Sequence, residues 1–170
     1  MALGKALDER AIVGPLAAGQ AAADVERQGE RAEVGSLVYS VLESRWATQL
    51  GEGSGSRAPR DRFLLLRLSV TNGSSHEVSV PLTSLEAAGG NSFGELTEVE
   101  GVPEWLGVLR KLQPVETAFG WVVFDVPQGD YKLRVADDAL IAEEARTALI
   151  EVPLRLGRTT DFLPTDTNTR

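Results

Sequence analysis

The sequence predicts an all-β domain, an antiparallel two-sheet β-sandwich with one short helix. Apolar residues alternate with polar ones at a period of two in several segments after residue 34, which is typical of strands that bury one face. Clusters of Gly, Pro, Asn, Asp and Ser separate these segments at the spacing of a sandwich. With 170 residues, 42% of them apolar, the chain is long enough for one domain. We expect that domain at residues 34–156, after a linker or weakly helical segment (1–33) and before a disordered tail (157–170).

Each predicted strand follows from its own pattern. Alternation predicts half-buried strands at residues 37–41, 64–70, 131–135 and 148–154. Residues 117–126 are apolar on both faces, so we expect a central strand whose second face is covered by loops or a neighbouring element. Burial of one face predicts that Leu66, Phe124 and Trp121 lie in the core.

One segment departs from this pattern. At residues 103–112, Trp105, Leu109 and Leu112 recur at i, i+4 and i+7, Pro103 stands at the start and two basic residues stand near the end. These features predict a short helix, which we expect to close one end of the sandwich.

Composition excludes several classes of function. Seventeen Lys and Arg against 25 Asp and Glu give a net charge of −8, which disfavours nucleic acid and acidic membrane surfaces as partners. No run of apolar residues approaches the length of a membrane span. The chain has no Cys, so disulfides, thiolate metal sites and thiol nucleophiles are not available.

The first residues do not form a secretory signal. Lys5, Asp8, Glu9 and Arg10 interrupt any apolar run. Two alternatives stay open: a cytoplasmic protein, or an exported one whose targeting segment or anchor lies upstream of Met1.

Motifs for catalysis are weak. His76 is the only histidine, and we expect it to be an exposed residue at a strand start rather than the base of a triad. The Gly-rich stretch 51–56 lacks the strand, helix and Lys of a phosphate-binding loop, so we expect an inter-strand loop, with anion contact through Arg57 and Arg60 as the alternative. No cofactor is expected.

Carboxylates cluster at Asp137, Asp138, Glu143 and Glu144 in the loop 137–144. The spacing of a dedicated calcium loop is missing, so we expect a solvated acidic loop. The alternative is a Ca²⁺-binding or hydrolytic protein built on these residues.

A recognition surface is the favoured kind of site. Trp46 and Trp105 are candidates for exposed aromatic anchors, and Arg57 and Arg60 lie in the loop that follows Trp46. We predict that these four residues contribute to a surface that recognises a partner.

The order of motifs resembles a known family. Val-Thr-Asn-Gly-Ser at residues 70–74, Phe-Asp-Val-Pro at 124–127 and Tyr-Lys-Leu-Arg-Val at 131–135 are similar, in that order, to the bacterial domain-of-unknown-function 4352 family over residues 34–154. The resemblance implies an immunoglobulin-like sandwich, a location outside the cytoplasm usually reached through an N-terminal lipid anchor or membrane segment, and no established enzymatic activity. This chain has no Cys at which a lipid anchor could be attached.

These inferences favour a non-catalytic, extracytoplasmic, immunoglobulin-like binding module whose partner is an unidentified protein or glycan. It would contact a membrane only through an upstream anchor. Besides the Ca²⁺-binding or hydrolytic alternative, a purely structural spacer or assembly domain is the third hypothesis.

Overall fold

The computed structural model describes residues 31–52, 56–139 and 144–153, so the predicted linker and tail lie almost entirely outside the described residues. Apart from Glu144, which has a 3₁₀-helical conformation, every regular element in these three ranges is a strand. The strands are β2 (Arg31–Val34), β3 (Leu37–Ala47), β4 (Phe63–Asn72), β5 (Val78–Ser79), β6 (Ser84–Ala87), β7 (Ser92–Gly94), β8 (Lys111–Leu112), β9 (Thr117–Asp125), β10 (Tyr131–Ala136) and β11 (Thr147–Glu151).

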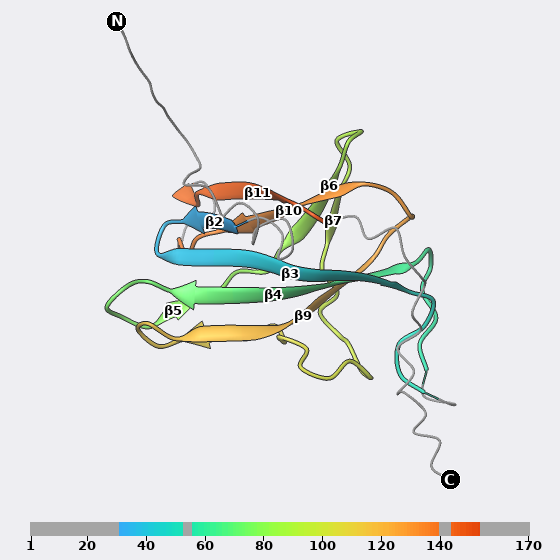
Figure 1. Ribbon diagram of the computed structural model, residues 1–170, viewed down its shortest axis with the longest axis horizontal. Helices are drawn as coiled ribbons and strands as arrows, with labels where there is room; N and C mark the ends of the chain where they lie inside the picture. The colour runs from blue at the N-terminus through green and yellow to red at the C-terminus, as the bar shows by residue number, and fades with distance from the viewer. Residues whose placement is uncertain (1–30, 53–55, 140–143, 154–170) are drawn as a thin grey trace, which may run out of the picture.

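The strands form a sandwich of antiparallel sheets (Figure 1). One sheet has the order β2-β3-β4-β9, the other has the order β11-β10-β6-β7, and β5 pairs with β8 as a short ribbon. Every pair within these sheets is antiparallel. The prediction of an all-β sandwich is confirmed.

The main core lies between the two sheets. Leu64, Leu66, Leu68 and Val70 alternate along β4 and all point into it, as does Phe124 on β9. Leu66 and Phe124 are fully buried, as their positions in the alternation predict.

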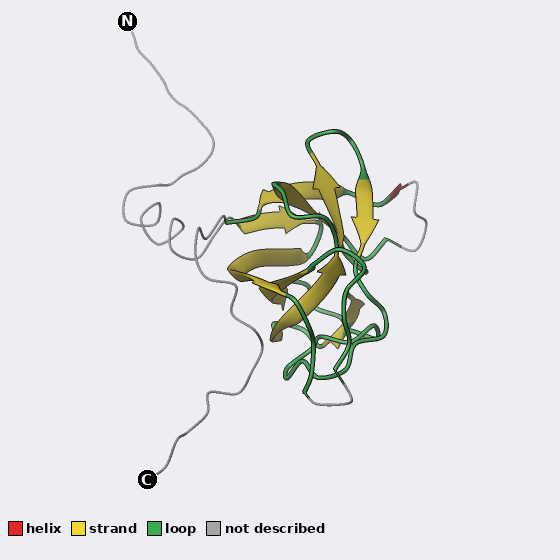
Figure 2. Cartoon of the chain, turned by 90° about the vertical axis from the view of Figure 1, so that its right-hand side faces the viewer, coloured by secondary structure: helices red, strands yellow, loops and turns green. Residues whose placement is uncertain are grey.

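A second apolar cluster covers the outer face of β4 and β9. We call it the outer cluster. Phe63 and Leu65 on β4, with Trp121 and Val123 on β9, pack under the loop between β7 and β8, which we call the outer loop. The outer loop contributes Leu96, Val99, Val102 and Trp105 to the cluster. In Figure 2 the long loops (green) gather beside the strands on one side of the molecule. The prediction that the second face of residues 117–126 is covered is therefore confirmed. The prediction that they form a central strand is wrong, because β9 is the edge strand of its sheet.

The predicted helix at residues 103–112 is wrong. Residues 103–110 are a loop, and residues 111–112 form β8. Glu104 and Gly107 have φ angles of 59° and 73°, in the left-handed region that a right-handed helix excludes. Trp105 packs in the outer cluster, Leu112 packs in the main core and Leu109 is 93% exposed, so the three residues do not share a face.

A buried ion pair fixes this loop to the second sheet. Arg110 and Glu95 have side chains that are 4% and 1% exposed, and the other oxygen of Glu95 accepts hydrogen bonds from Thr83 N (2.7 Å) and Thr83 Oγ1 (2.5 Å). Charged groups are this deeply buried only when they are paired.

Within the described ranges, no helix has the length and apolar character needed to cross a membrane.

Candidate binding site

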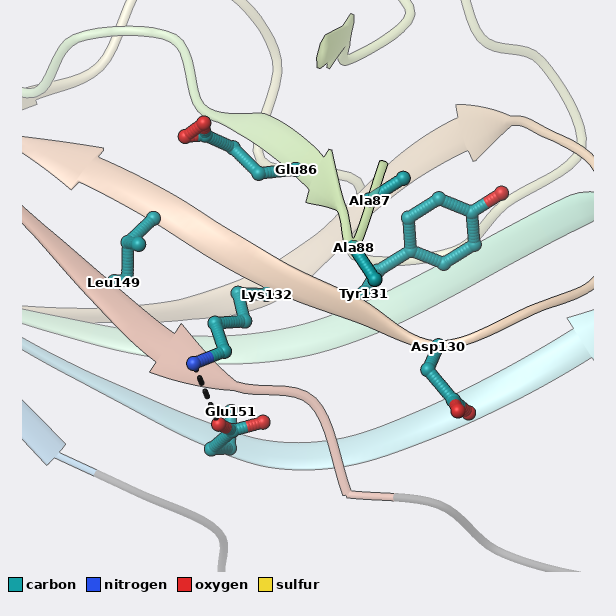
Figure 3. A pocket seen from close by; sticks show the side chains of 8 residues that line it. All are labelled: Glu86, Ala87, Ala88, Asp130, Tyr131, Lys132, Leu149 and Glu151. Carbon is teal, nitrogen blue, oxygen red and sulfur yellow. Dashed lines mark ion pairs between the residues drawn. The ribbon is translucent and has the colours of Figure 1, made fainter. Parts of the chain in front are cut away.

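A hollow of about 430 Å³ lies on the outer face of the second sheet, where β6, β10 and β11 run side by side (Figure 3). Its lining comes from the end of β6 and the residue after it, from the start of β10 and from β11. The lining residues are Glu86, Ala87, Ala88, Asp130, Tyr131, Lys132, Leu149 and Glu151. We call this feature the β10 hollow.

Strand register brings its charged residues into one row. Lys132 on β10 lies opposite Glu86 on β6 and opposite Glu151 on β11. Because side chains alternate across a strand, Lys132 points outward while its neighbours Tyr131 and Leu133 are buried. Three residues far apart in the sequence therefore form an acidic-basic-acidic row across the sheet.

Most of these charged side chains are in ion pairs. Lys132 Nζ lies 3.0 Å from Glu151 Oε1, the pair drawn with a dashed line in Figure 3. Glu86 pairs with Arg134, which lies one step further along the outer face of β10. Asp130 is exposed, and among the described residues no basic group pairs with it.

Apolar surface lies between the charges. Leu149 is 43% exposed in the hollow, and Ala87 and Ala88 add small side chains. Tyr131 also contributes to the lining, but its ring lies on the core side of β10, where it makes an edge contact with Phe93 with 5.9 Å between ring centroids. Burial, followed by the negative charge of Asp61, raises the pKa of Tyr131 above the usual value for tyrosine, so this phenol is neutral near pH 7.

The lining of the hollow combines charged groups with apolar carbon. It offers an ammonium group, three carboxylates and aliphatic carbon, and none of its eight residues is Ser, Thr, Cys or His. The single lysine here is in an ion pair with Glu151.

The structure does not bring the predicted tryptophans together. Trp46 on β3 is half-buried, packs against the main core and has its ring 6.4 Å from that of Tyr131. Trp105 is half-buried in the outer cluster, on the opposite face of the same sheet. A single surface containing both rings is therefore not formed by the described residues.

The two predicted arginines are exposed, but they also serve the fold. Arg57 Nη1 donates to the carbonyl of Glu98 at 2.8 Å, which attaches the β3–β4 loop to the outer loop. The backbone N–H groups of Arg60 and Asp61 donate to the two carboxylate oxygens of Asp125 at 2.7 and 2.9 Å. Neither arginine lines the β10 hollow.

The acidic loop has a structural role at its first residue. Asp137 Oδ1 accepts hydrogen bonds from the N–H groups of Ala139 (3.3 Å) and Arg146 (3.1 Å), which closes the connection between β10 and β11. Glu143 lies outside the described residues. Elsewhere in the described ranges, no three His, Cys, Asp or Glu side chains gather as a metal site.

His76 and Asn72 lie at the turn after β4. His76 is exposed. Asn72 is fully buried, and its Nδ2 donates to the carbonyls of His76, Leu112 and Gln113. These bonds attach the turn after β4 to the segment that follows β8.

Sequence reasoning did not find the β10 hollow. The alternation in residues 131–135 marks Lys132 as outward-facing, but it does not show which strands flank it. The pairing partners of β10 are set by sheet topology, which places β6 and β11 on either side of it.

Comparisons with known proteins agree with this architecture. Solved structures with the same fold include the yjhA protein from Bacillus subtilis (15% identity, TM-score 0.57, covering 73% of this chain and 96% of that one). A functionally unknown protein from Listeria monocytogenes EGD-e is similar at 14% identity and TM-score 0.55, covering 74% of this chain and 82% of that one. A Bacillus subtilis protein described as "a putative lipoprotein (ycdA)" matches at 13% identity and TM-score 0.53, covering 74% of this chain and 38% of that one.

No curated protein matches the sequence. The model of one protein family, the Domain of unknown function (DUF4352), matches residues 27–146, which include β2 to β10. That match spans well over half of the chain and agrees with the strand motifs, the antiparallel sandwich and the solved structures. The chain therefore belongs to the DUF4352 family.

Proposed function

We propose that this chain is a non-catalytic binding module that acts outside the cytoplasm and takes part of a protein or glycan partner into the β10 hollow. The observation that carries the proposal is the hollow itself, about 430 Å³ of space with exposed leucine, an ammonium group and three carboxylates around it. Ligand sites combine apolar surface with a few placed polar groups in this manner.

Support for the location comes from the family and from one structural relative. The resemblance to the DUF4352 family implies export, and a fold relative is described as a lipoprotein. Fractionation of native cells, with mass spectrometry of the N-terminus of the protein, tests this part. A processed N-terminus in the envelope fraction supports export, and an intact Met1 in the cytosol contradicts it.

Binding is tested by titrating the ¹⁵N-labelled chain with small probes and following amide chemical shifts. Suitable probes are N-acetylglucosamine, glucose, butylamine and acetyl-arginine-amide, which present hydroxyl groups or a cation on an aliphatic stem. Shifts that cluster at Lys132, Leu149 and Glu151 support the hollow as the binding site.

A matched pair of variants separates the hollow from exposed leucine in general. Leu149 in the hollow is 43% exposed, and Leu82 outside it is 46% exposed. We expect Leu149→Gln to weaken probe binding and Leu82→Gln to leave it unchanged. Equal effects of both variants, or no clustered shift with any probe, would contradict the proposed site.

A further inference from the structure

The edge of β9 is closed along only part of its length. β9 is the last strand of its sheet. Trp121 N–H donates to the carbonyl of Glu104 at 2.9 Å, and the Trp121 carbonyl accepts from Leu106 N–H at 3.0 Å. Further along, the carbonyl of Val123 accepts from Leu96 N–H at 2.7 Å. The outer loop of the chain itself therefore covers the edge from Trp121 onward.

Among the described residues, no segment pairs with the other end of the same edge, which we call the open edge. In an antiparallel pair, alternate residues turn both main-chain groups away from the neighbouring strand. Trp121 and Val123 do so, and the same alternation applies to Thr117 and Phe119. Within the described residues, no hydrogen bond is made by the outward N–H or C=O of Thr117 or Phe119.

Side chains beside this open edge are apolar and exposed. Phe119 is 56% exposed and Val115, two residues before the strand, is 79% exposed. The residues on β4 opposite Phe119 and Thr117 are small: Ser69 pairs with Phe119, and Thr71 pairs with Thr117. Natural edges are commonly protected by lysine, proline or a bulge, and residues 117–119 contain neither lysine nor proline.

We propose that residues 117–119 accept an extended segment of another polypeptide as an added strand, with an apolar side chain of that segment against Phe119. Free main-chain donors and acceptors in alternation are complementary to another main chain. The outer loop already pairs with the same edge in this way two residues further along β9, where Trp105 forms a parallel β-bridge with Trp121.

The length of the open edge decides between a peptide and a second copy of the chain. A stable dimer buries about 800 Å² on each partner. Three residues, bounded by the turn at Glu104 on one side and by the start of β9 on the other, offer too little sheet edge for that. This edge belongs to the other sheet from the β10 hollow, so the inference does not depend on the proposed function.

Hydrogen exchange of the full chain, followed amide by amide by NMR, tests the open edge directly. In the free protein we expect fast exchange at Thr117 and Phe119 and slow exchange at Ala118 and Gly120, whose N–H groups face β4. The probe is acetyl-(Thr-Val)₃-Lys-amide, and its control is the same peptide with alternate backbone nitrogens methylated. At nine-tenths occupancy the probe should slow the exchange of Phe119 about tenfold, and the methylated copy should not.

Two variants test the role of the aromatic side chain. Phe119→Lys should weaken probe binding by about tenfold or more, whereas Leu109→Lys, at a 93% exposed position in the outer loop, should leave it unchanged. Slow exchange at Phe119 in the free protein overturns the proposal, as does equal slowing by both peptides. Protection that grows with protein concentration would assign the edge to a second copy and also overturns it.

Discussion

Removal of one partner of the buried Arg110–Glu95 pair should destabilise the domain strongly. Glu95→Leu leaves the guanidinium of Arg110, 4% exposed, without a counter-charge, and removes the acceptor of both Thr83 donors. Breaking a buried pair from one side costs about 3–5 kcal/mol in the free energy of unfolding. Arg110→Met should fall in the same range, because it leaves the carboxylate with Thr83 alone.

Removal of both charges should cost less than the two single changes together. In Glu95→Leu/Arg110→Met neither charge remains buried, and apolar replacement of a buried pair is often close to neutral. The unsatisfied donors of Thr83 still cost about 1–3 kcal/mol. The double variant should therefore be more stable than the sum of its parts by about 3 kcal/mol or more.

Urea unfolding, followed by tryptophan fluorescence and far-ultraviolet circular dichroism, measures these differences. Glu104→Ala is the control, because it breaks the pair of Glu104 with Arg67, whose side chains are 58% and 33% exposed, and should cost less than about 1 kcal/mol. Single variants within 1 kcal/mol of the parent, or a double variant equal to their sum, would refute the role given to this pair.

Three further changes have defined outcomes. Phe124→Ala should lower the free energy of unfolding by about 3–5 kcal/mol and Phe119→Ala by about 0.5 kcal/mol or less; similar urea midpoints for the two variants would contradict this assignment of the faces of β9. Burial raises the pKa of Tyr39 above the usual value for tyrosine, so above about pH 10 the unfolded chain loses a proton that the folded chain keeps, and stability should fall by up to about 1.4 kcal/mol per pH unit. Tyr39→Phe should reduce this loss, and an unchanged slope in that variant would contradict the assignment. Val115→Gly should raise the melting temperature, because Val115 has a φ of 65°, which costs a β-branched residue about 1 kcal/mol or more; an unchanged or lower melting temperature would show that this strain is absent.

The inner face of the sandwich could be predicted because alternation and burial carry the same information. Leu66 and Phe124 hold inward positions in the alternation, and a one-residue slip would move them out of the main core. The covered second face of residues 117–126 was equally visible, since Trp121 and Val123 break the alternation. The sequence of β9 alone does not show which segment covers that face, because the covering residues belong to the outer loop.

The false helix shows where periodicity fails. Trp105, Leu109 and Leu112 match a helical face by spacing, but two of them pack in different layers and the third is in solvent. Gly107 was the available contrary signal, because a glycine within a short helix is unfavourable and here it has a positive φ. The row of Glu86, Lys132 and Glu151 could not be predicted at all, because it depends on the pairing of strands distant in sequence.

The two proposed surfaces should act independently, and this makes their tests separable. The β10 hollow is on the sheet of β10 and β11, whereas the open edge is on β9, and the main core lies between these sheets. Sites that share no contacting residues usually give additive effects. Leu149→Gln should therefore leave the slowing of exchange at Phe119 by the peptide unchanged, and Phe119→Lys should leave the shifts produced at Lys132 by the small probes unchanged. A variant that alters both readouts would show that the sandwich transmits a change between its sheets, and each surface would then have to be assigned again from variants that preserve the core.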